Sequence, residues 1–294
     1  MLPKIEIDPK TFLHKHCSLP ALPEVLTRIQ NLAQGNNVDM GAIAALISAD
    51  PSLVAEVLKV VNSAYYGLPH EISRVRAAIA YLGLHEVYHL VLSLSIIKSF
   101  QIGGKELREF WFHSYYTAVC AKHLARKFQP LMPHEELWSA AILHDIGKLV
   151  YLKFFPEHYQ ALQSYSAEQG CLFSQAEKHF SCPSSGYLGG LLCDHWRLPD
   201  SVRQACAFHT LDDLATVDQN RPPTDLQLMV SAGNLLAVVS TQRVSKDVGE
   251  AIAATTIRAL NLTQDHFLPL IADIYELKSE AEDFLNQFEP PVTP

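Results

Sequence analysis

Residues 141–148 read Ala-Ile-Leu-His-Asp-Ile-Gly-Lys, and this stretch sets two polar side chains, His144 and Asp145, inside an apolar helical run. Polar groups that become buried need hydrogen-bonding partners. Adjacent side chains on one helix point about 100° apart, so both can reach one site only if it lies between that helix and its neighbours. The stretch therefore predicts a protein of packed helices with a polar site between them.

Helical periodicity extends from this stretch in both directions. Towards the N-terminus, residues 20–100 divide into five short amphipathic helices that end at glycine, proline or asparagine turns. Beyond residue 105 we expect helices at about 106–128, 135–154, 157–169, from 174 onward, 189–196, 200–208, 225–242, 246–260 and 268–284, with a loop at 212–224. No alternating strand pattern interrupts them, so the predicted fold class is all-α.

Composition limits the possible partners and the location. The 294 residues are 48% hydrophobic and 18% charged, with a net charge of −8. This is the composition of a globular chain with a large core, and its acidic balance does not favour nucleic acid or anionic lipid as a partner. The start of the sequence has no apolar leader and no apolar run approaches a membrane span, so we expect a cytoplasmic protein. The six cysteines include no Cys-x-x-Cys pair and are expected to be reduced.

A second histidine, His113, falls on the helix expected at 106–128. Antiparallel packing of that helix on the next one could bring it to His144 and Asp145. Iron, manganese and magnesium accept such mixed nitrogen and oxygen ligands, so the three residues could form part of a metal site. In the alternative, His113 hydrogen-bonds Asp145 and only holds two helices together. Lys148 could offer its ammonium group to a phosphate, or could be a solvated surface lysine.

Further segments carry a resemblance to a known family. They read Leu-Pro-Ala-Leu-Pro-Glu at 19–24, Asp-Pro-Ser-Leu at 50–53, Val-Asn-Ser-Ala-Tyr-Tyr-Gly at 61–67, Ala-Ile-Ala-Tyr-Leu-Gly at 78–83, Phe-Trp-Phe-His-Ser at 110–114 and Trp-Arg-Leu-Pro at 196–199. Together with 143–148, they resemble the HDOD family, the HD-related output domains of bacterial signalling, over about residues 18–240.

The resemblance implies a division of the chain. An N-terminal five-helix bundle at 18–105 would pack on an HD-like helical core at 106–240. A lead-in at 1–17 would precede this HDOD domain, and C-terminal helices and a tail would follow at 241–294.

The resemblance also implies a ligand set. Active HD phosphohydrolases bind metal through a histidine, the His-Asp pair and a further aspartate, and their two-metal relatives add more histidines. On this sequence the first three ligands would be His113, His144 and Asp145. Asn234 stands where the distal aspartate would fall, and a neutral amide is a weak metal ligand. Where relatives often carry a histidine pair, this sequence has one histidine, His209.

Hydrolysis requires a firmly bound metal and neutralisation of the phosphate charge, and the loss of an anionic ligand weakens both. We therefore expect a non-catalytic signal-transduction module that acts through an unidentified signalling protein or a nucleotide-type ligand. It would carry no cofactor, or a weakly bound divalent metal such as Fe, Mn or Mg. The alternative is a metal-dependent phosphohydrolase acting on a nucleotide or cyclic dinucleotide, with His209 as a further ligand. Its missing carboxylate could come from Asp212, Asp213, Asp218 or Asp225.

The segment 63–69 combines two tyrosines, Tyr65 and Tyr66, with a Gly-Leu-Pro turn and no carboxylate. Exposed aromatic side chains there could contact a partner protein. The same side chains could equally fill space as a buried plug, and the sequence leaves both readings open.

Overall fold

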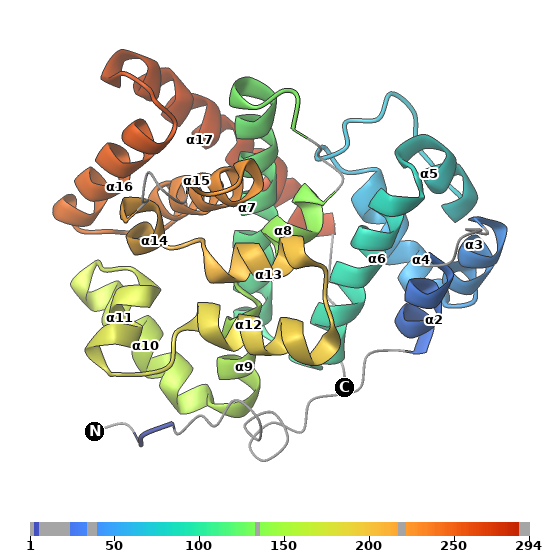
Figure 1. Ribbon diagram of the computed structural model, residues 1–294, viewed down its shortest axis with the longest axis horizontal. Coiled ribbons are helices and arrows are strands. Elements are labelled where there is room, and N and C mark those ends of the chain that lie inside the picture. The colour runs from blue at the N-terminus through green and yellow to red at the C-terminus, as the bar shows by residue number, and fades with distance from the viewer. Residues whose placement is uncertain (1–2, 6–23, 34–39, 133–135, 217–221, 288–294) are drawn as a thin grey trace.

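The computed structural model describes residues 3–5, 24–33, 40–132, 136–216 and 222–287, and these form helices joined by short connections (Figure 1). The helices are α2 (Glu24–Ala33), α3 (Met40–Ser48), α4 (Pro51–Val61), α5 (Val75–Leu82), α6 (Leu84–Ser99), α7 (Lys105–Phe128), α8 (Leu137–Leu143), α9 (Ile146–Phe154), α10 (Pro156–Gln169), α11 (Phe173–His179), α12 (Ser185–Trp196), α13 (Asp200–Ala207), α14 (Leu211–Ala215), α15 (Asp225–Thr241), α16 (Lys246–Ala259) and α17 (Gln264–Gln287). No strand occurs among these residues, which confirms the all-α prediction.

The N-terminal helices α2–α6 form a bundle on one side of the molecule (Figure 1). α4 shows how the sequence sets a boundary: the Leu53 amide donates to Asp50 Oδ1 at 3.1 Å, and Pro51 occupies the first turn, where its missing N–H costs nothing. α6 is the most enclosed helix of the bundle, with eleven buried residues, because it also packs against α8. The bundle therefore joins the rest of the fold through α6.

α7 is the central helix of the remaining part and packs against α8, α15 and α17 (Figure 1). Gly233 on α15 permits a close approach to α7, since a Cβ at that position would lie 2.8 Å from the Ala121 amide nitrogen. The rings of Tyr115 and Phe284 stack at 3.8 Å between centroids and join α7 to α17. The helices around α7 thus enclose one continuous apolar core with the bundle.

The prediction of a single helix at 135–154 is wrong. The segment is divided into α8 and α9 by a turn at His144 and Asp145. His144 Nδ1 lies 2.7 Å from the Ala141 carbonyl oxygen, and the Lys148 amide donates to the Asp145 carbonyl at 2.8 Å. The polar pair therefore lies at a break between helices, where both side chains can turn towards one site.

Part of the loop expected at 212–224 is also wrong, because α14 covers its beginning. Thr210 caps this helix by accepting from the Asp213 amide, and Asp213 accepts from the Thr210 amide in return.

The turn at 63–69 fills space between the bundle and the core. Gly67 adopts the left-handed conformation, with φ of 58°. Tyr65 is only 4% exposed and its ring meets Trp138 at 4.8 Å between centroids. The Tyr66 hydroxyl donates to Glu86 Oε1 at 2.7 Å. Tyr65 therefore fills space inside the protein, and the alternative of an exposed contact is wrong for that residue. Tyr66 is half-buried, and a partner contact there stays a prediction.

Within the described ranges, no single helix is both long and apolar enough to cross a membrane. α3 and α4 meet that criterion only as a pair that bends by 112°. The five described cysteines form no disulfide with one another, and their reduced state stays a prediction.

Replacement of Gly147 tests the contact between α9 and α12. A Cβ at Gly147 would overlap the Ser185 carbonyl oxygen and lie 2.8 Å from the Gly189 amide nitrogen. We expect Gly147→Ala to lower the free energy of unfolding by about 2 kcal/mol or more, because backbone rather than a flexible side chain must move. Thermal and urea denaturation would measure the change.

Gly190→Ala on α12 is the matched control, since nothing lies within 4 Å of its added Cβ. It should be neutral or stabilise by up to about 1 kcal/mol. Equal losses in the two variants would contradict the proposed close approach.

Candidate functional site

Four side chains converge where α7, the α8–α9 break and the α13–α14 connection meet. Asp145 lies at the centre and is 1% exposed. Its Oδ2 is 3.3 Å from the Nε2 atoms of both His113 and His144, and its Oδ1 is 3.3 Å from Nε2 of His209. The structure thus brings the predicted residues together, and we refer to these four as the His-Asp cluster.

The backbone fixes the orientation of two imidazoles. His144 Nδ1 faces the Ala141 carbonyl, and His209 Nδ1 lies 2.9 Å from the Cys206 carbonyl oxygen. A carbonyl can only accept, so Nδ1 carries a proton in both rings, and Nε2 is the ring nitrogen that faces Asp145. Metal-binding histidines are held in this way by a second hydrogen bond.

Several buried polar atoms of this region lack a hydrogen-bond partner. They are both ring nitrogens of His113, Nε2 of His144, Oδ1 of Asp145 and Oδ1 of Asn234. Ligand atoms of His113, His144 and Asp145 all lie within 4.8 Å of one another. Unpartnered imidazole and carboxylate atoms around one point fit a divalent metal that accepts nitrogen and oxygen ligands. That these residues bind one stays a prediction.

Lys148 lies inside the site. Its Nζ is 2.6 Å from Asp145 Oδ2 and 5.0 Å from the centre of the Phe173 ring, and its side chain is 20% exposed. The expectation of a solvated surface lysine is therefore wrong. The ammonium group already neutralises the buried carboxylate, so a metal would have to compete with it for Oδ2.

Charge and burial set the protonation of the His-Asp cluster. Burial alone would raise the pKa of Asp145, but Lys148, His144 and His113 together hold it well below its usual range. Burial lowers the pKa of His113 to about 4, against the opposing contact with Asp145. For His209, burial again favours the neutral ring, but the close contact with Asp145 and the charge of that carboxylate outweigh burial and raise the pKa of the ring. At neutral pH the carboxylate is ionised and His113 is neutral.

Asn234, on α15, lines the same region as Asp145 and His209. Its Nδ2 donates to the His209 backbone carbonyl at 2.8 Å. This bond positions the histidine and leaves Oδ1 as a neutral oxygen beside the His-Asp cluster. Where the resemblance implies an aspartate, position 234 therefore adds no negative charge to the site.

The aspartates considered as substitutes have other contacts. Asp212 pairs with Lys178 at 2.6 Å on the surface, and Asp213 accepts from the backbone at the start of α14. Asp225 lies in the first turn of α15. Asp218 is outside the described residues. Among the described residues, Asp145 is the only carboxylate grouped with His113 and His144.

A cavity of about 630 Å³ opens beside the His-Asp cluster. His113, Asp145 and Lys148 form part of its wall, together with the aromatic residues Phe110, Phe112, Tyr159 and Phe173. The basic residues Lys105, Arg108 and Arg243 and the acidic residue Glu109 line it further out. With Lys148, four cations therefore face two carboxylates among the described residues that line the cavity. These outer residues were not predicted, because they come from helix ends far apart in the sequence.

Glu177 was also missed by the sequence analysis. It is buried on α11 and accepts from the Ser185 amide at 2.7 Å. Burial raises its pKa to about 7. A single glutamate on a short amphipathic helix gives no sequence signal of such burial.

The family model of the HDOD domain matches residues 19–211. The chain belongs to the HDOD domain family. A relative from Treponema pallidum (strain Nichols), of uncharacterised function, is 28% identical over 191 residues, which are 65% of this chain and 37% of the relative. The chain thus spans little more than a third of that relative.

Solved HDOD-type structures share the fold. An HDOD domain protein of unknown function from Geobacter sulfurreducens is 21% identical, with a TM-score of 0.69 over 95% of this chain and 96% of its own. A protein from Shewanella amazonensis SB2B, provisionally named a phosphohydrolase, is 21% identical. Its TM-score is 0.67, over 95% of this chain and 98% of its own. A protein from Marinobacter aquaeolei VT8, provisionally named a signal transduction protein, is 20% identical. Its TM-score is 0.66, over 96% of this chain and 62% of its own. At these identities the likeness shows the fold alone.

Removal of the Lys148 ammonium group should leave the carboxylate of Asp145 buried without its counter-ion. We expect Lys148→Met to lower the free energy of unfolding at pH 7 by about 3 kcal/mol in the presence of chelator. Lys153→Met, an exposed lysine on the same helix, is the control and should change stability by less than about 0.5 kcal/mol. A Lys148→Met variant as stable as the control would contradict the ion pair.

The loss of stability caused by Lys148→Met should depend on pH. Because the folded-state pKa of Asp145 is depressed, the stability it contributes is present above its unfolded pKa of about 4 and is lost as pH falls further. The difference in stability between wild type and Lys148→Met should therefore be full at pH 6–7 and shrink towards pH 3. Melting temperatures across this range, with chelator present, would measure it. A constant difference would contradict an ionised Asp145.

Proposed function

We propose that this chain is a bacterial, cytoplasmic regulatory module of signal transduction that binds an anionic, nucleotide-type ligand beside the His-Asp cluster without hydrolysing it. The observation that carries the proposal is the charge of the cavity. Four cationic side chains line it against two carboxylates, although the whole chain has a net charge of −8. A local positive field in an acidic protein favours a phosphate-bearing ligand.

The size and lining of the cavity support a nucleotide-type ligand. Its volume of about 630 Å³ lies within the usual range for small-molecule sites. Arg108 and Arg243 can make paired hydrogen bonds with phosphate oxygens. Phe110, Phe112 and Phe173 supply apolar and aromatic surface on which a base could stack.

The donor set favours binding over hydrolysis. A divalent metal held by His113, His144, Asp145 and His209 would supply an activated water and neutralise phosphate oxygens. Among the described residues, the site offers a single carboxylate, already paired with Lys148, and the amide of Asn234 adds no charge. A weakly held metal is the expected consequence, so the ligand would remain intact.

Several separate helices could respond to the ligand. The cavity wall comes from α7, α9 and α10, from the connection after α15, and from Leu285 on α17. A ligand that contacts all of them would favour one arrangement of these helices. We propose that an unidentified signalling protein recognises this arrangement.

Phosphohydrolase activity remains the second candidate, and one observation favours it. Three imidazoles surround Asp145, and several of their ring nitrogens lack hydrogen-bond partners. The substrate would be a nucleotide or a cyclic dinucleotide in the same cavity.

Binding and hydrolysis can be measured on the same samples. We would titrate ATP, GTP and cyclic di-GMP calorimetrically, with chelator and then with Mn²⁺, and follow phosphate-ester cleavage by chromatography. We expect saturable binding of at least one ligand without cleavage. Arg243→Ala should weaken that binding at least tenfold, whereas Arg76→Ala, an exposed arginine outside the cavity, should not.

Two outcomes would overturn the proposal. Mn²⁺-dependent cleavage that disappears in Asp145→Asn would establish a phosphohydrolase. Absence of binding to all three ligands would contradict a nucleotide-type ligand.

A further inference from the structure

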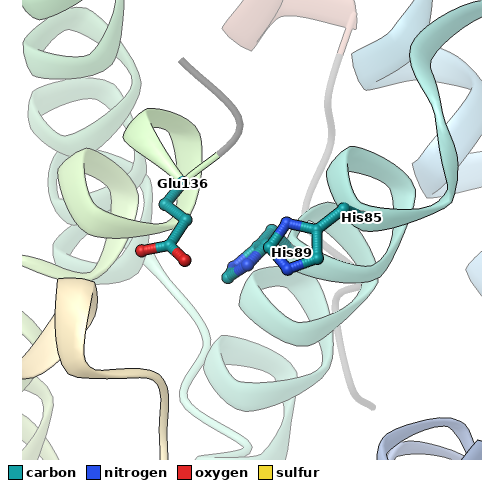
Figure 2. A group of neighbouring side chains, drawn as sticks. All are labelled: His85, His89 and Glu136. Carbon is teal, nitrogen blue, oxygen red and sulfur yellow. The ribbon is translucent and has the colours of Figure 1, made fainter. Parts of the chain in front are cut away.

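A second group of possible ligands lies where the N-terminal bundle meets the core, apart from the His-Asp cluster. His85 and His89 are on α6, and Glu136 immediately precedes α8. Each offers one ligand atom, and the three atoms lie within 4.8 Å of one another. Figure 2 shows the Glu136 carboxylate extending towards the two imidazoles. None of these residues lines the 630 Å³ cavity.

The spacing of the histidines suits a metal. Residues 85–89 read His-Glu-Val-Tyr-His, which places the two imidazoles one turn apart on one helix face. The ring centroids are 4.7 Å apart. Two helical histidines at this spacing, with a glutamate from another element, form a common zinc ligand set.

A neighbouring serine fixes the buried histidine. Ser139 Oγ donates to the Glu136 carbonyl oxygen at 3.1 Å and lies 2.8 Å from His89 Nδ1. With the single hydroxyl proton donated to that carbonyl, His89 Nδ1–H is the donor in the second contact. Nε2 then carries the lone pair and can bind a metal. This is the supporting hydrogen bond that metal-binding histidines usually make.

Burial and access are both suitable. His89 is 1% exposed, so its imidazole is held inside the fold. His85 is exposed, which leaves a path for a metal from solvent. A neutral imidazole and a carboxylate need not release a proton to become ligands.

Glu86, between the two histidines, is engaged elsewhere. It accepts from the Tyr66 hydroxyl at 2.7 Å. Zinc peptidases use a glutamate at this position as their general base. The contact with Tyr66 argues against that role for Glu86 here.

We propose that His85, His89 and Glu136 bind a divalent metal of the zinc class that fastens α6 to α8. Water would complete the tetrahedral shell. α8 carries Glu136 at its N-terminal end and His144 at its C-terminal end. The metal therefore ties the bundle to the helix that leads into the His-Asp cluster.

Zinc uptake by the full chain tests this site. Protein stripped with chelator would be titrated with Zn²⁺ alone, and bound zinc measured by elemental analysis after gel filtration. We expect His85→Ala to bind one equivalent of zinc less than wild type. Glu136→Gln should lower the affinity for that zinc ion at least tenfold. His70→Ala, another exposed histidine of the bundle, is the matched control and should keep it. Because His85 is exposed, its removal should leave the fold intact, which circular dichroism would verify.

Asp145→Asn distinguishes this site from the His-Asp cluster, because it removes the carboxylate of that cluster only. This variant should retain the equivalent of zinc that His85→Ala loses. Zn²⁺ should also raise the melting temperature of Asp145→Asn but not that of the double variant with His85→Ala. Equal zinc uptake and equal melting shifts with and without His85 would overturn the proposal, as would wild-type protein that takes up no Zn²⁺. Nucleotide binding in His85→Ala is a separate measurement, so failure of one site leaves the other testable.

Discussion

The ionised carboxylate of Asp145 is the constraint around which the core is arranged. An isolated charge buried to this extent would be costly, so it needs several compensating partners. Lys148 supplies the counter-charge from the next turn of α9, and three imidazoles approach from α7, the α8–α9 break and the α13–α14 connection. These partners fix how the helices meet. They also give the cavity its positive wall, because Lys148 and the helix ends beside it face the same space.

The sequence was a good guide wherever a signal was local or repeated. The five N-terminal helices follow from apolar periodicity, and the start of α4 follows from Asp50 and Pro51. The family pattern pointed to His113, His144, Asp145, His209 and Asn234 as one region, and the structure brings them to it. Their binding of a metal, and the domain boundaries, remain predictions. The prediction of one helix at 135–154 was wrong, because apolar residues continue through the break and the turn at His144 leaves no signal in the pattern.

Features set by tertiary contact were beyond the sequence analysis. The burial of Glu177 and the position of Arg243 on the cavity wall depend on helices that meet far apart along the chain. The histidine pair on α6 was overlooked, although its spacing was visible, because the ligand from another element becomes apparent only when α6 packs on α8. The two clusters occupy opposite ends of α8. One short helix thereby links the bundle, the proposed zinc site and the His-Asp cluster.

Anomalous diffraction from crystals soaked in Mn²⁺ tests the absence of a hydrolytic centre most directly. We expect Lys148 Nζ to stay in contact with Asp145 Oδ2, with no more than one Mn²⁺ peak in the His-Asp cluster. Two Mn²⁺ peaks bridged by Asp145, with Lys148 displaced, would show an intact hydrolytic centre and contradict a binding module.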